Sequence, residues 1–272
     1  MLYLCIPSFN EAPTVGVLLW RIRKVFQEYS REYEVIVYDD GSTDATTETL
    51  ASYGKVLPLT LLRSEQRRGY GQALEALARD VSRRTRYPRR DAMIVLQGDF
   101  TDPPEAIPEL VKRFEGGADI VIGERERATM PVPVRRLATV GPWVMRPFVS
   151  QPDTTDPFGA FRLYRIALVR DYLKANPDTS LVTSDGWAAN LELLVKLTSF
   201  ARRVEKVAVA PRYDIRPRES RVRPFADAMS LYRAGRSARG WGARAAGRAA
   251  ASSDRAADRS SDRNADKNAG AA

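Results

Sequence analysis

Residues 1–125 alternate short apolar runs with longer amphipathic stretches, and this alternation restricts the fold more than any other feature of the chain. The apolar runs predict strands at 2–7, 34–38, 59–63, 92–96 and 119–123. The stretches between them have helical apolar spacing and predict helices at 14–29, 46–53, 71–84 and 105–114. Strands that alternate with helices in this way favour an α/β fold, in which a Rossmann-like, mostly parallel sheet has helices on both faces.

A polar cluster follows each predicted strand. In chain order the clusters read PSFNE, YDDGSTD, RRGYG, QGD and GER. Ligands of open parallel sheets bind beyond the carboxyl ends of the strands. The clusters therefore predict one shared site at that edge of the sheet.

The composition removes several kinds of catalysis. The chain has no histidine, and its one cysteine, Cys5, lies inside the first predicted strand. These counts exclude Ser-His-Asp and Cys-His catalysis and every zinc site that contains histidine. A bound metal would therefore be a hard cation held by oxygen atoms, such as Mg²⁺ or Mn²⁺.

The sequence shows no sign of membrane insertion or export. No apolar run approaches the roughly 18 residues that a transmembrane helix needs. The first residues, MLYLCIPSFN, have the character of a buried strand rather than of a signal peptide. We therefore expect a cytoplasmic protein.

The net charge of +9 comes from residues 202–248, because basic and acidic residues balance before and after this section. Within it, Phe225, Met229 and Tyr232 fall on one helical stripe, which favours either an interfacial helix on anionic lipid or a helix packed on the domain. RNA binding is not favoured, since no aromatic-rich recognition motif accompanies the charge. Residues 249–272 are of low complexity and predict a disordered tail.

Asp39 and Asp40 follow the second predicted strand. They could form a turn before the next helix, or accept hydrogen bonds from a nucleobase or ribose. Pro7, Phe9 and Glu11 follow the neighbouring strand and would form a wall beside the same base. The stretch RRGYGQAL lacks the complete G-x-G-x-x-G pattern and follows the third strand, which argues against a Rossmann dinucleotide site.

The stretch VLQGDFTDPPE delivers Asp99 to a strand end, and two prolines then end the strand. A carboxylate in such a place commonly holds a metal ion or a sugar. Gln97 stands two residues earlier, where a second carboxylate would be expected. The stretch is therefore a working metal site, a modified one, or a loop that only looks like one. Asp102 could supply the missing carboxylate, but its simpler role is to cap the segment that begins at Pro103.

Several stretches resemble, in order and approximate spacing, the family-2 glycosyltransferases, and among these the dolichol- or polyprenyl-phosphate mannose synthase branch. They are CIPSFNEAPTV, YDDGSTDAT, RRGYGQAL, VLQGDFTDPPE, VIGERER, TDPFGAFRLYR and RESRV. The resemblance covers about residues 1–222, which would form the catalytic domain, followed by a basic helical segment at 223–248 and the tail at 249–272. It implies a GT-A fold, inversion at the anomeric carbon, a GDP- or UDP-hexose donor and a divalent cation.

The resemblance assigns roles to individual residues of the stretch VLQGDFTDPPE. The family usually has Asp-x-Asp-x-Gln where this chain has Gln97, Asp99 and Thr101. Asp99 matches the carboxylate that holds the metal against the donor pyrophosphate, and Thr101 replaces a neutral ligand. Gln97 and Gly98 would contact the nucleotide sugar. Because one anionic ligand remains, we expect Mg²⁺ or Mn²⁺ to bind weakly. A metal-independent or inactive protein is the alternative.

The resemblance also implies catalytic residues later in the chain. Arg125 and Arg162 match positions that line the family's site, where a guanidinium binds phosphate oxygens through two hydrogen bonds. Asp156 and Asp185 are candidate acceptor-side carboxylates. One of them would be the general base for a hydroxyl acceptor, whereas Asp185 could also be only a helix cap.

A loop near the end of the resemblance would complete the donor site. Arg218, Ser220 and Arg221 match a family loop that closes over the diphosphate. Arg221 stands where the family often has lysine, which keeps the charge but changes the geometry.

These features together predict a hexosyltransferase. The expected reaction moves mannose or glucose from a nucleotide sugar to a polyprenyl phosphate at the cytoplasmic face of an anionic membrane, where the protein would be peripheral. One alternative is a family-2 transferase with a hydroxyl acceptor in a polysaccharide, glycolipid or small solute. Another is a degenerate protein that binds nucleotide sugars without turnover.

Overall fold

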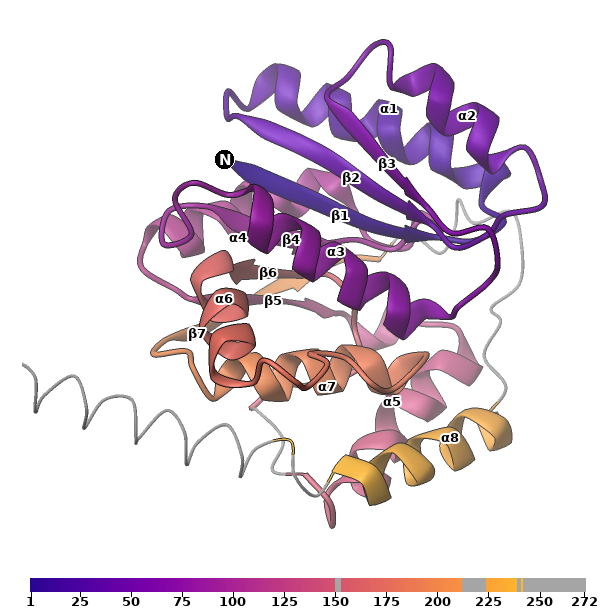
Figure 1. Cartoon of the computed structure of the whole chain (residues 1–272). Coiled ribbons are helices and arrows are strands. Elements are labelled where there is room, and N and C mark those ends of the chain that lie inside the picture. The colour runs from indigo at the N-terminus through magenta and orange to yellow at the C-terminus, as the bar shows by residue number, and fades with distance from the viewer. Residues whose placement is uncertain (150–152, 212–223, 239–240, 242–272) are drawn as a thin grey trace, which may run out of the picture.

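The computed structural model describes residues 1–149, 153–211, 224–238 and 241 (Figure 1). Within these residues one sheet of seven strands forms the centre of the fold. The strands are β1 (Leu2–Ser8), β2 (Tyr33–Asp39), β3 (Leu59–Arg63), β4 (Ala92–Val95), β5 (Ile120–Arg125), β6 (Arg162–Arg165) and β7 (Val204–Val209). Their order is β3-β2-β1-β4-β6-β5-β7, and β6 runs antiparallel to both of its neighbours. The mostly parallel sheet confirms the predicted α/β fold.

Helices cover both faces of this sheet. They are α1 (Ala12–Glu28), α2 (Thr46–Tyr53), α3 (Tyr70–Arg84), α4 (Ile107–Glu115), α5 (Val132–Met145), α6 (Ile166–Ala175), α7 (Trp187–Thr198) and α8 (Pro224–Ser237), with 3-10 turns at Pro104–Ala106 and Arg127–Thr129. α1, α2 and α4 share one core with Leu4 and Ile6 of β1. α3, α6 and α7 share the other core with Tyr3 and Cys5. Alternate residues of one buried strand therefore supply both cores, as the period of a strand requires.

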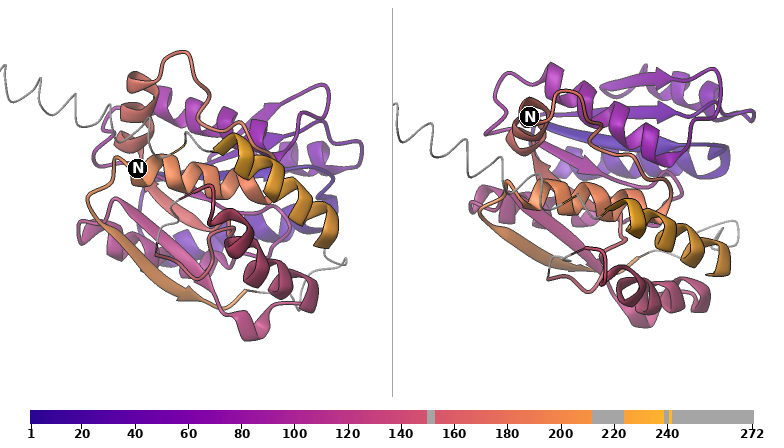
Figure 2. Two further views of the ribbon diagram at one scale, coloured as in Figure 1. Left: turned by 90° about the horizontal axis from the view of Figure 1, so that it is seen from below. Right: turned by 60° about the horizontal axis from the view of Figure 1, so that its bottom comes forward.

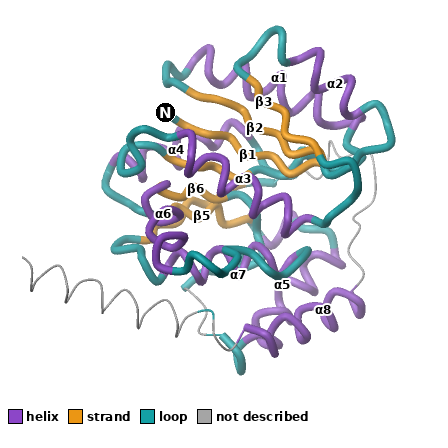
Figure 3. Tube along the Cα trace, in the orientation of Figure 1, coloured by secondary structure: helices purple, strands orange, loops and turns teal. Residues whose placement is uncertain are grey.

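The register of the central strands brings their carboxyl ends together. β1 pairs in parallel with β2 and with β4, so that Ser8 lies beside Asp39 and Cys5 beside Val95. The loops that follow β1, β2 and β3 consequently gather at one edge of the sheet (Figure 3). This is the edge at which the polar clusters predicted a shared site.

α5 and α8 form an additional layer below α7 (Figures 1 and 2). Leu137 and Met145 of α5 share a buried cluster with Leu231 of α8 and with residues of α7. Gly141 makes this packing possible, because a Cβ atom there would lie 2.5 Å from Phe158. The described part of the basic segment thus packs on the domain along one side. The proposed boundaries at 222 and 248 stay predictions, and the tail at 249–272 lies outside the described residues.

No helix among the described residues combines the length and the apolarity that crossing a bilayer requires.

Candidate active site

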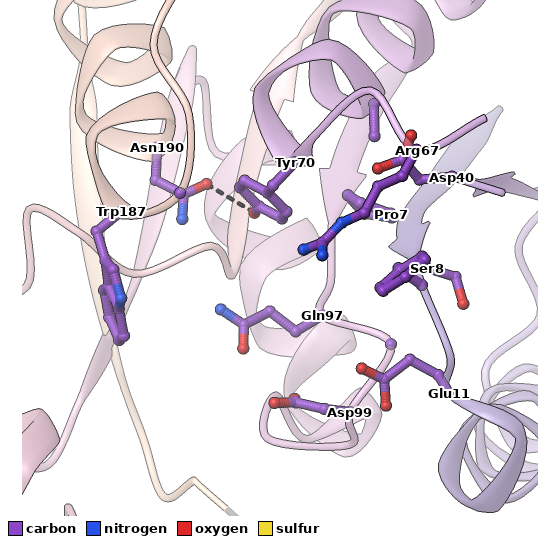
Figure 4. A pocket seen from close by; sticks show the side chains of 14 residues that line it. Pro7, Ser8, Glu11, Asp40, Arg67, Tyr70, Gln97, Asp99, Trp187 and Asn190 are labelled. Atoms are coloured by element: carbon purple, nitrogen blue, oxygen red, sulfur yellow. Dashed lines mark hydrogen bonds between the residues drawn. The ribbon is translucent and has the colours of Figure 1, made fainter. Parts of the chain in front are cut away.

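A pocket of about 240 Å³ opens beyond the carboxyl ends of β1, β2 and β4 (Figure 4). Its lining comes from segments that are far apart in the sequence: Pro7, Ser8, Phe9, Glu11, Asp40, Arg67, Tyr70, Ala73, Gln97, Gly98, Asp99, Gly186, Trp187 and Asn190. The structure therefore gathers seven of the predicted site residues around one space, namely Pro7, Phe9, Glu11, Asp40, Gln97, Gly98 and Asp99. Their contacts with a donor stay predictions.

The loop after β1 is tied to its neighbours by side-chain hydrogen bonds. Asn10 has a positive φ of 53°, and its backbone N–H donates to Ser42 Oγ at 3.0 Å. Thr14 Oγ1 lies 3.0 Å from both Glu11 Oε2 and the Gly98 carbonyl oxygen, so it links this loop to the one after β4. Glu11 is held at the pocket wall as a result.

The two adjacent aspartates at the carboxyl end of β2 have different surroundings. Asp39 is fully buried, and its carboxylate accepts hydrogen bonds from the Ser42 N–H at 3.0 Å and from Thr47 Oγ1 at 2.7 Å. Asp40 accepts the backbone N–H groups of Arg68 at 2.7 Å and Gly69 at 2.9 Å, and it lines the pocket. Asp39 therefore orders the start of α2 from behind the pocket, and its predicted contact with a nucleobase stays a prediction.

The loop after β4 presents Asp99 through a tight backbone turn. Asp99 Oδ1 accepts the Thr101 N–H at 3.0 Å, and Asp102 Oδ2 accepts the Gln97 N–H at 2.9 Å. Between them Phe100 adopts a φ of 64° with its ring buried. A positive φ is unfavourable for a bulky side chain and persists only where the surroundings impose it. The loop is therefore built to hold Asp99 toward the pocket.

Asp102 is buried, and burial raises its pKa to about 7, against the opposing charge of Arg125 and the hydrogen bond from the Gln97 N–H. An unfolded Asp has a pKa of about 3.9, so the folded chain holds a proton that the unfolded chain releases between about pH 4 and pH 7. Asp102 therefore favours folding at low pH, and this contribution is lost as the pH rises through about 7.

We expect Asp102→Asn to flatten this part of the pH dependence of stability. The melting temperature of the unmodified chain should fall relative to that of the variant between about pH 4 and pH 7, and the difference should level off above that. The asparagine side chain keeps an oxygen that can accept the Gln97 N–H. Thermal melts of both proteins across this range test the prediction, and parallel curves would contradict it.

The residues at the pocket fit a divalent cation in part. Among the described residues, no three acidic, cysteine or histidine side chains form a metal-binding group. Asp99 lines the pocket, and Mg²⁺ commonly uses one or two carboxylates together with substrate phosphates. Thr101 Oγ1 is buried without a hydrogen-bond partner in the described part of the chain, but Thr101 does not line the pocket. The donor set thus fits a cation held chiefly by Asp99 and by the phosphates of a bound donor.

Arg125 and Arg162 lie behind the pocket wall. Arg125 makes a two-point ion pair with Asp156, with Nη2 2.9 Å from Oδ1, and both side chains are buried. Burial opposes ionisation of Asp156, but the charge and hydrogen bonds of Arg125 outweigh it and keep the pKa of Asp156 below its usual value. Arg162 donates to the carbonyl oxygens of Asn190 at 2.6 Å and Asp156 at 3.0 Å. Neither arginine lines the pocket, so their predicted contact with phosphate stays a prediction.

The far wall of the pocket comes from α3 and α7. The Tyr70 hydroxyl donates to Asn190 Oδ1 at 2.8 Å, and Asn190 Nδ2 donates to the Phe158 carbonyl oxygen at 3.0 Å (Figure 4). Trp187 stands beside them, with the guanidinium of Arg125 5.8 Å from the centre of its ring. Asp185 is exposed at the start of α7 and accepts the Gly71 N–H at 2.9 Å. Asp185 does not line the pocket; its carboxylate ties the segment before α7 to the first turn of α3, and its predicted catalytic role stays a prediction.

The segment that leads into α7 is held by a buried carboxylate. Glu192 Oε2 accepts the backbone N–H groups of Thr183 at 2.9 Å and Ser184 at 2.7 Å, while its Oε1 pairs with Lys196 at 2.6 Å. Buried charges are stable only when paired and hydrogen-bonded in this manner. The position of Trp187 at the pocket is consequently fixed from within α7 itself.

Sequence reasoning missed the other seven residues of the lining, namely Ser8, Arg67, Tyr70, Ala73, Gly186, Trp187 and Asn190. Arg67 and Tyr70 belong to the RRGYG cluster, which carried a signal for the site but no residue assignment. The guanidinium of Arg67 stacks 4.2 Å from the centre of the Phe9 ring and points into the pocket (Figure 4). Trp187 and Asn190 gave no signal, because only the packing of α7 brings them near.

The predicted loop residues Arg218, Ser220 and Arg221 lie outside the described residues.

A pocket at the carboxyl ends of a mostly parallel sheet, with one carboxylate presented by the loop after a central strand, defines a class of α/β enzyme that binds its substrates at this edge. Residues 3–173 match the family model described as Glycosyl transferase family 2. The chain therefore belongs to this family.

Two curated relatives narrow the comparison. The chain is 32% identical over 120 residues to the dolichol-phosphate mannosyltransferase of Pyrococcus furiosus. The matched residues make up 44% of this chain and 32% of that protein. It is 28% identical over 178 residues to the prophage bactoprenol glucosyl transferase homolog of Escherichia coli K12. Here the matched residues make up 65% of this chain and 56% of that protein. The matches thus span between about a third and just over half of these relatives' lengths.

A solved structure shows the same fold. It is the glucosyl-3-phosphoglycerate synthase of Mycobacterium tuberculosis in complex with Mn²⁺, UDP and phosphoglyceric acid. The TM-score is 0.55 at 20% identity, over 86% of this chain and 75% of that one. The predicted GT-A fold and the predicted family are both confirmed.

Proposed function

We propose that this protein is a glycosyltransferase that moves a hexose, mannose or glucose, from a nucleotide sugar to a polyprenyl phosphate, with inversion at the anomeric carbon. The observation that carries the proposal is the pocket itself, in which Asp99 and Gln97 on one segment meet Phe9, Glu11 and their neighbours on another. The two relatives, a dolichol-phosphate mannosyltransferase and a bactoprenol glucosyl transferase homolog, support this class of acceptor by their names.

The two ends of the pocket suit the two parts of a donor. Phe9, Arg67 and Asp40 offer an aromatic face, a cation and a carboxylate, which suit a nucleoside and its phosphates. Tyr70, Trp187 and Asn190 lie across the pocket (Figure 4). An aromatic ring beside an amide is a usual surface for a sugar, because C–H groups pack on the ring while hydroxyl groups bond to the amide. We assign the hexose to this second end.

Asp99 would hold a divalent cation, with Thr101 as a predicted further ligand. When bound, Mg²⁺ or Mn²⁺ would neutralise the nucleoside diphosphate as it leaves. The protein's contribution is to present Asp99 on the strained turn at Phe100, so that the carboxylate faces the pocket before any ligand arrives.

The chemistry of the acceptor decides whether a general base is needed. A phosphate acceptor is already ionised near neutral pH, so its oxygen can attack without losing a proton to the protein. A hydroxyl acceptor needs a base within hydrogen-bond reach, and Asp185, which precedes the pocket residue Gly186, is the candidate carboxylate. The loss of activity on Asp185→Asn would therefore be severe for a hydroxyl acceptor and mild for a lipid phosphate.

A donor-hydrolysis screen tests the proposed function. GDP- and UDP-linked mannose and glucose would be incubated with the chain, with and without Mn²⁺ and with and without a polyprenyl phosphate. Stimulation by the lipid phosphate, with a glycolipid product, would support the proposal. Turnover that does not change with the lipid phosphate but increases with a hydroxyl acceptor would favour the alternative of a family-2 transferase that uses a hydroxyl acceptor. Donor binding without any product would favour a degenerate binding protein.

Trp187→Ala should raise the KM for the donor about tenfold, because the variant removes the aromatic surface of the hexose end. Trp187→Phe keeps a ring and should restore most of the affinity. Trp20→Ala on α1 is a matched control, since Trp20 is exposed and does not line the pocket. Steady-state kinetics at a fixed acceptor concentration, with melting curves to verify folding, measure the effect. An unchanged kcat/KM in Trp187→Ala would remove this residue from the hexose end.

We further propose that the protein works as a peripheral protein at the inner face of an anionic membrane. The concentration of positive charge in residues 202–248 supports this location. A lipid-phosphate acceptor would also be found there. Of this basic section, the structure describes 202–211, 224–238 and 241.

A further inference from the structure

The outward face of α5 carries large apolar side chains that the fold leaves exposed. Val132, Val140 and Trp143 are 48%, 49% and 76% exposed. Their spacing places them on one stripe of the helix, opposite the buried Leu137 and Gly141. Trp143 is the most exposed large hydrophobic side chain in the described part of the chain. Apolar groups gathered on one exposed stripe mark a surface that binds a partner.

The charged residues of α5 and of the segment just after it are all arginines. Arg135, Arg136 and Arg146 are exposed, and none of them pairs with a carboxylate among the described residues. α5 itself contains no Asp or Glu. Arg233 and Arg236 on α8 are also exposed and lack an acidic partner in the same residues. A surface of this kind attracts an anionic partner.

α8 extends the apolar character of the same end of the molecule. Met229 and Tyr232 are 52% and 46% exposed. The ring of Tyr232 meets that of Phe148, just beyond the end of α5, in an edge-to-face contact at 5.6 Å between ring centres. α5 and α8 lie side by side in two views of the fold (Figure 2).

We propose that α5 and the adjoining part of α8 dock on an anionic lipid bilayer, with Trp143 at the interface and the arginines on the headgroup phosphates. Exposed tryptophan flanked by arginine is the composition of membrane-surface helices. The chain's own tail does not offer a covering for the stripe, since residues 249–272 consist only of Ala, Gly, Ser, Asn, Asp, Arg and Lys. The apolar groups and phosphates that would cover the stripe must therefore come from a source other than residues 249–272.

The docking surface is one helix away from the pocket. On the inner side of α5, Val134 and Ala138 form a small cluster with Met130, and Trp187 packs against it. Trp187 also lines the pocket. Docking through α5 would therefore set the pocket wall close to the bilayer, where a lipid phosphate could enter. This last step rests on the proposed function, whereas the docking does not.

Cosedimentation of the full chain with vesicles tests the docking. The vesicles are phosphatidylcholine alone, or phosphatidylcholine mixed with phosphatidylglycerol. We expect binding to the mixed vesicles that falls with added salt. Trp143→Ala should weaken it about tenfold, and Arg135→Gln with Arg136→Gln about 25-fold, at roughly fivefold for each arginine. Trp20→Ala, which removes a 51% exposed tryptophan from α1, should change it less than about twofold. Equal binding by all four proteins would overturn the proposal.

A second measurement separates insertion from simple charge attraction. Brominated lipids in the mixed vesicles should quench tryptophan fluorescence, and Trp143→Phe should remove most of this quenching while Trp20→Phe keeps it. Quenching that survives in Trp143→Phe would overturn the insertion of Trp143. A dimer that Trp143→Ala converts to a monomer would assign the surface to a second copy instead. Donor hydrolysis without vesicles should be unaffected by Trp143→Ala, so a failure of docking remains distinct from a failure of the proposed function.

Discussion

Asp99→Asn is expected to lower turnover by about 100- to 1,000-fold while the chain remains folded. Asparagine keeps the shape of the side chain and an oxygen that can accept the Thr101 N–H, which the structure places 3.0 Å from Asp99 Oδ1. It removes the charge that a divalent cation needs, and no other carboxylate of the loop after β4 lines the pocket. Melting curves and a Mn²⁺ titration of donor turnover measure the two effects separately.

Gln97→Asp provides the opposite change at the same site. Gln97 lines the pocket two residues before Asp99, so an aspartate there adds a second carboxylate beside the cation. The Mn²⁺ concentration for half-maximal activity should fall. If Asp99 only shapes the loop, Asp99→Asn would lose thermal stability and leave the metal dependence unchanged. Normal turnover of Asp99→Asn in the presence of metal would rule out Asp99 as the carboxylate that holds the cation.

The sequence predicted the fold well where local patterns and tertiary packing agree. The predicted strands at 2–7, 34–38 and 59–63 correspond to β1, β2 and β3, because each is a short, largely apolar run between helical stretches. β6 and β7 were harder. β6 is a short strand whose residues are largely buried, yet two of its four residues are arginines. Its pairing with β4 and β5 decides its structure, and that information is not local.

For the site too, some residues could be predicted from local sequence patterns and others depend on tertiary packing. Strand-end clusters predicted Phe9, Asp40 and Asp99 at one pocket, since parallel strands bring their carboxyl ends to one edge. Trp187 and Asn190 could not be predicted, because their place depends on how α7 packs against α3 and on the buried Glu192 that holds the preceding segment.

Arg125 illustrates what a motif does not determine. The resemblance predicts it as a site residue that binds phosphate, and in the structure its guanidinium is buried against Asp156, with side chains that are 2% and 1% exposed. A motif identifies a position but does not show which way the side chain turns, so the contact with phosphate stays a prediction.

Replacing either partner of the Arg125–Asp156 pair should destabilise the fold by about 3–5 kcal/mol. Each single change, Arg125→Leu or Asp156→Leu, leaves one charge buried without its partner, and the cost of that charge dominates. The double variant removes both charges and should recover most of the stability. Asp119→Asn is a matched control, because Asp119 pairs with Arg165 while their side chains are 16% and 19% exposed, and it should cost only about 1 kcal/mol. Urea unfolding measures all four variants.

Arg125→Lys separates the structural role of this arginine from the predicted catalytic one. Lysine keeps the charge but cannot reproduce the two-point bond with Asp156, so a structural role predicts an intermediate loss of stability. Arg125 also stands behind Trp187, and loosening it should raise the KM for the donor more than it lowers kcat. A collapse of kcat in a stably folded Arg125→Lys would instead mean that the guanidinium reaches the donor phosphate during turnover. In that case the ion pair with Asp156 would have to open, and Asp156→Asn should then raise activity rather than reduce it.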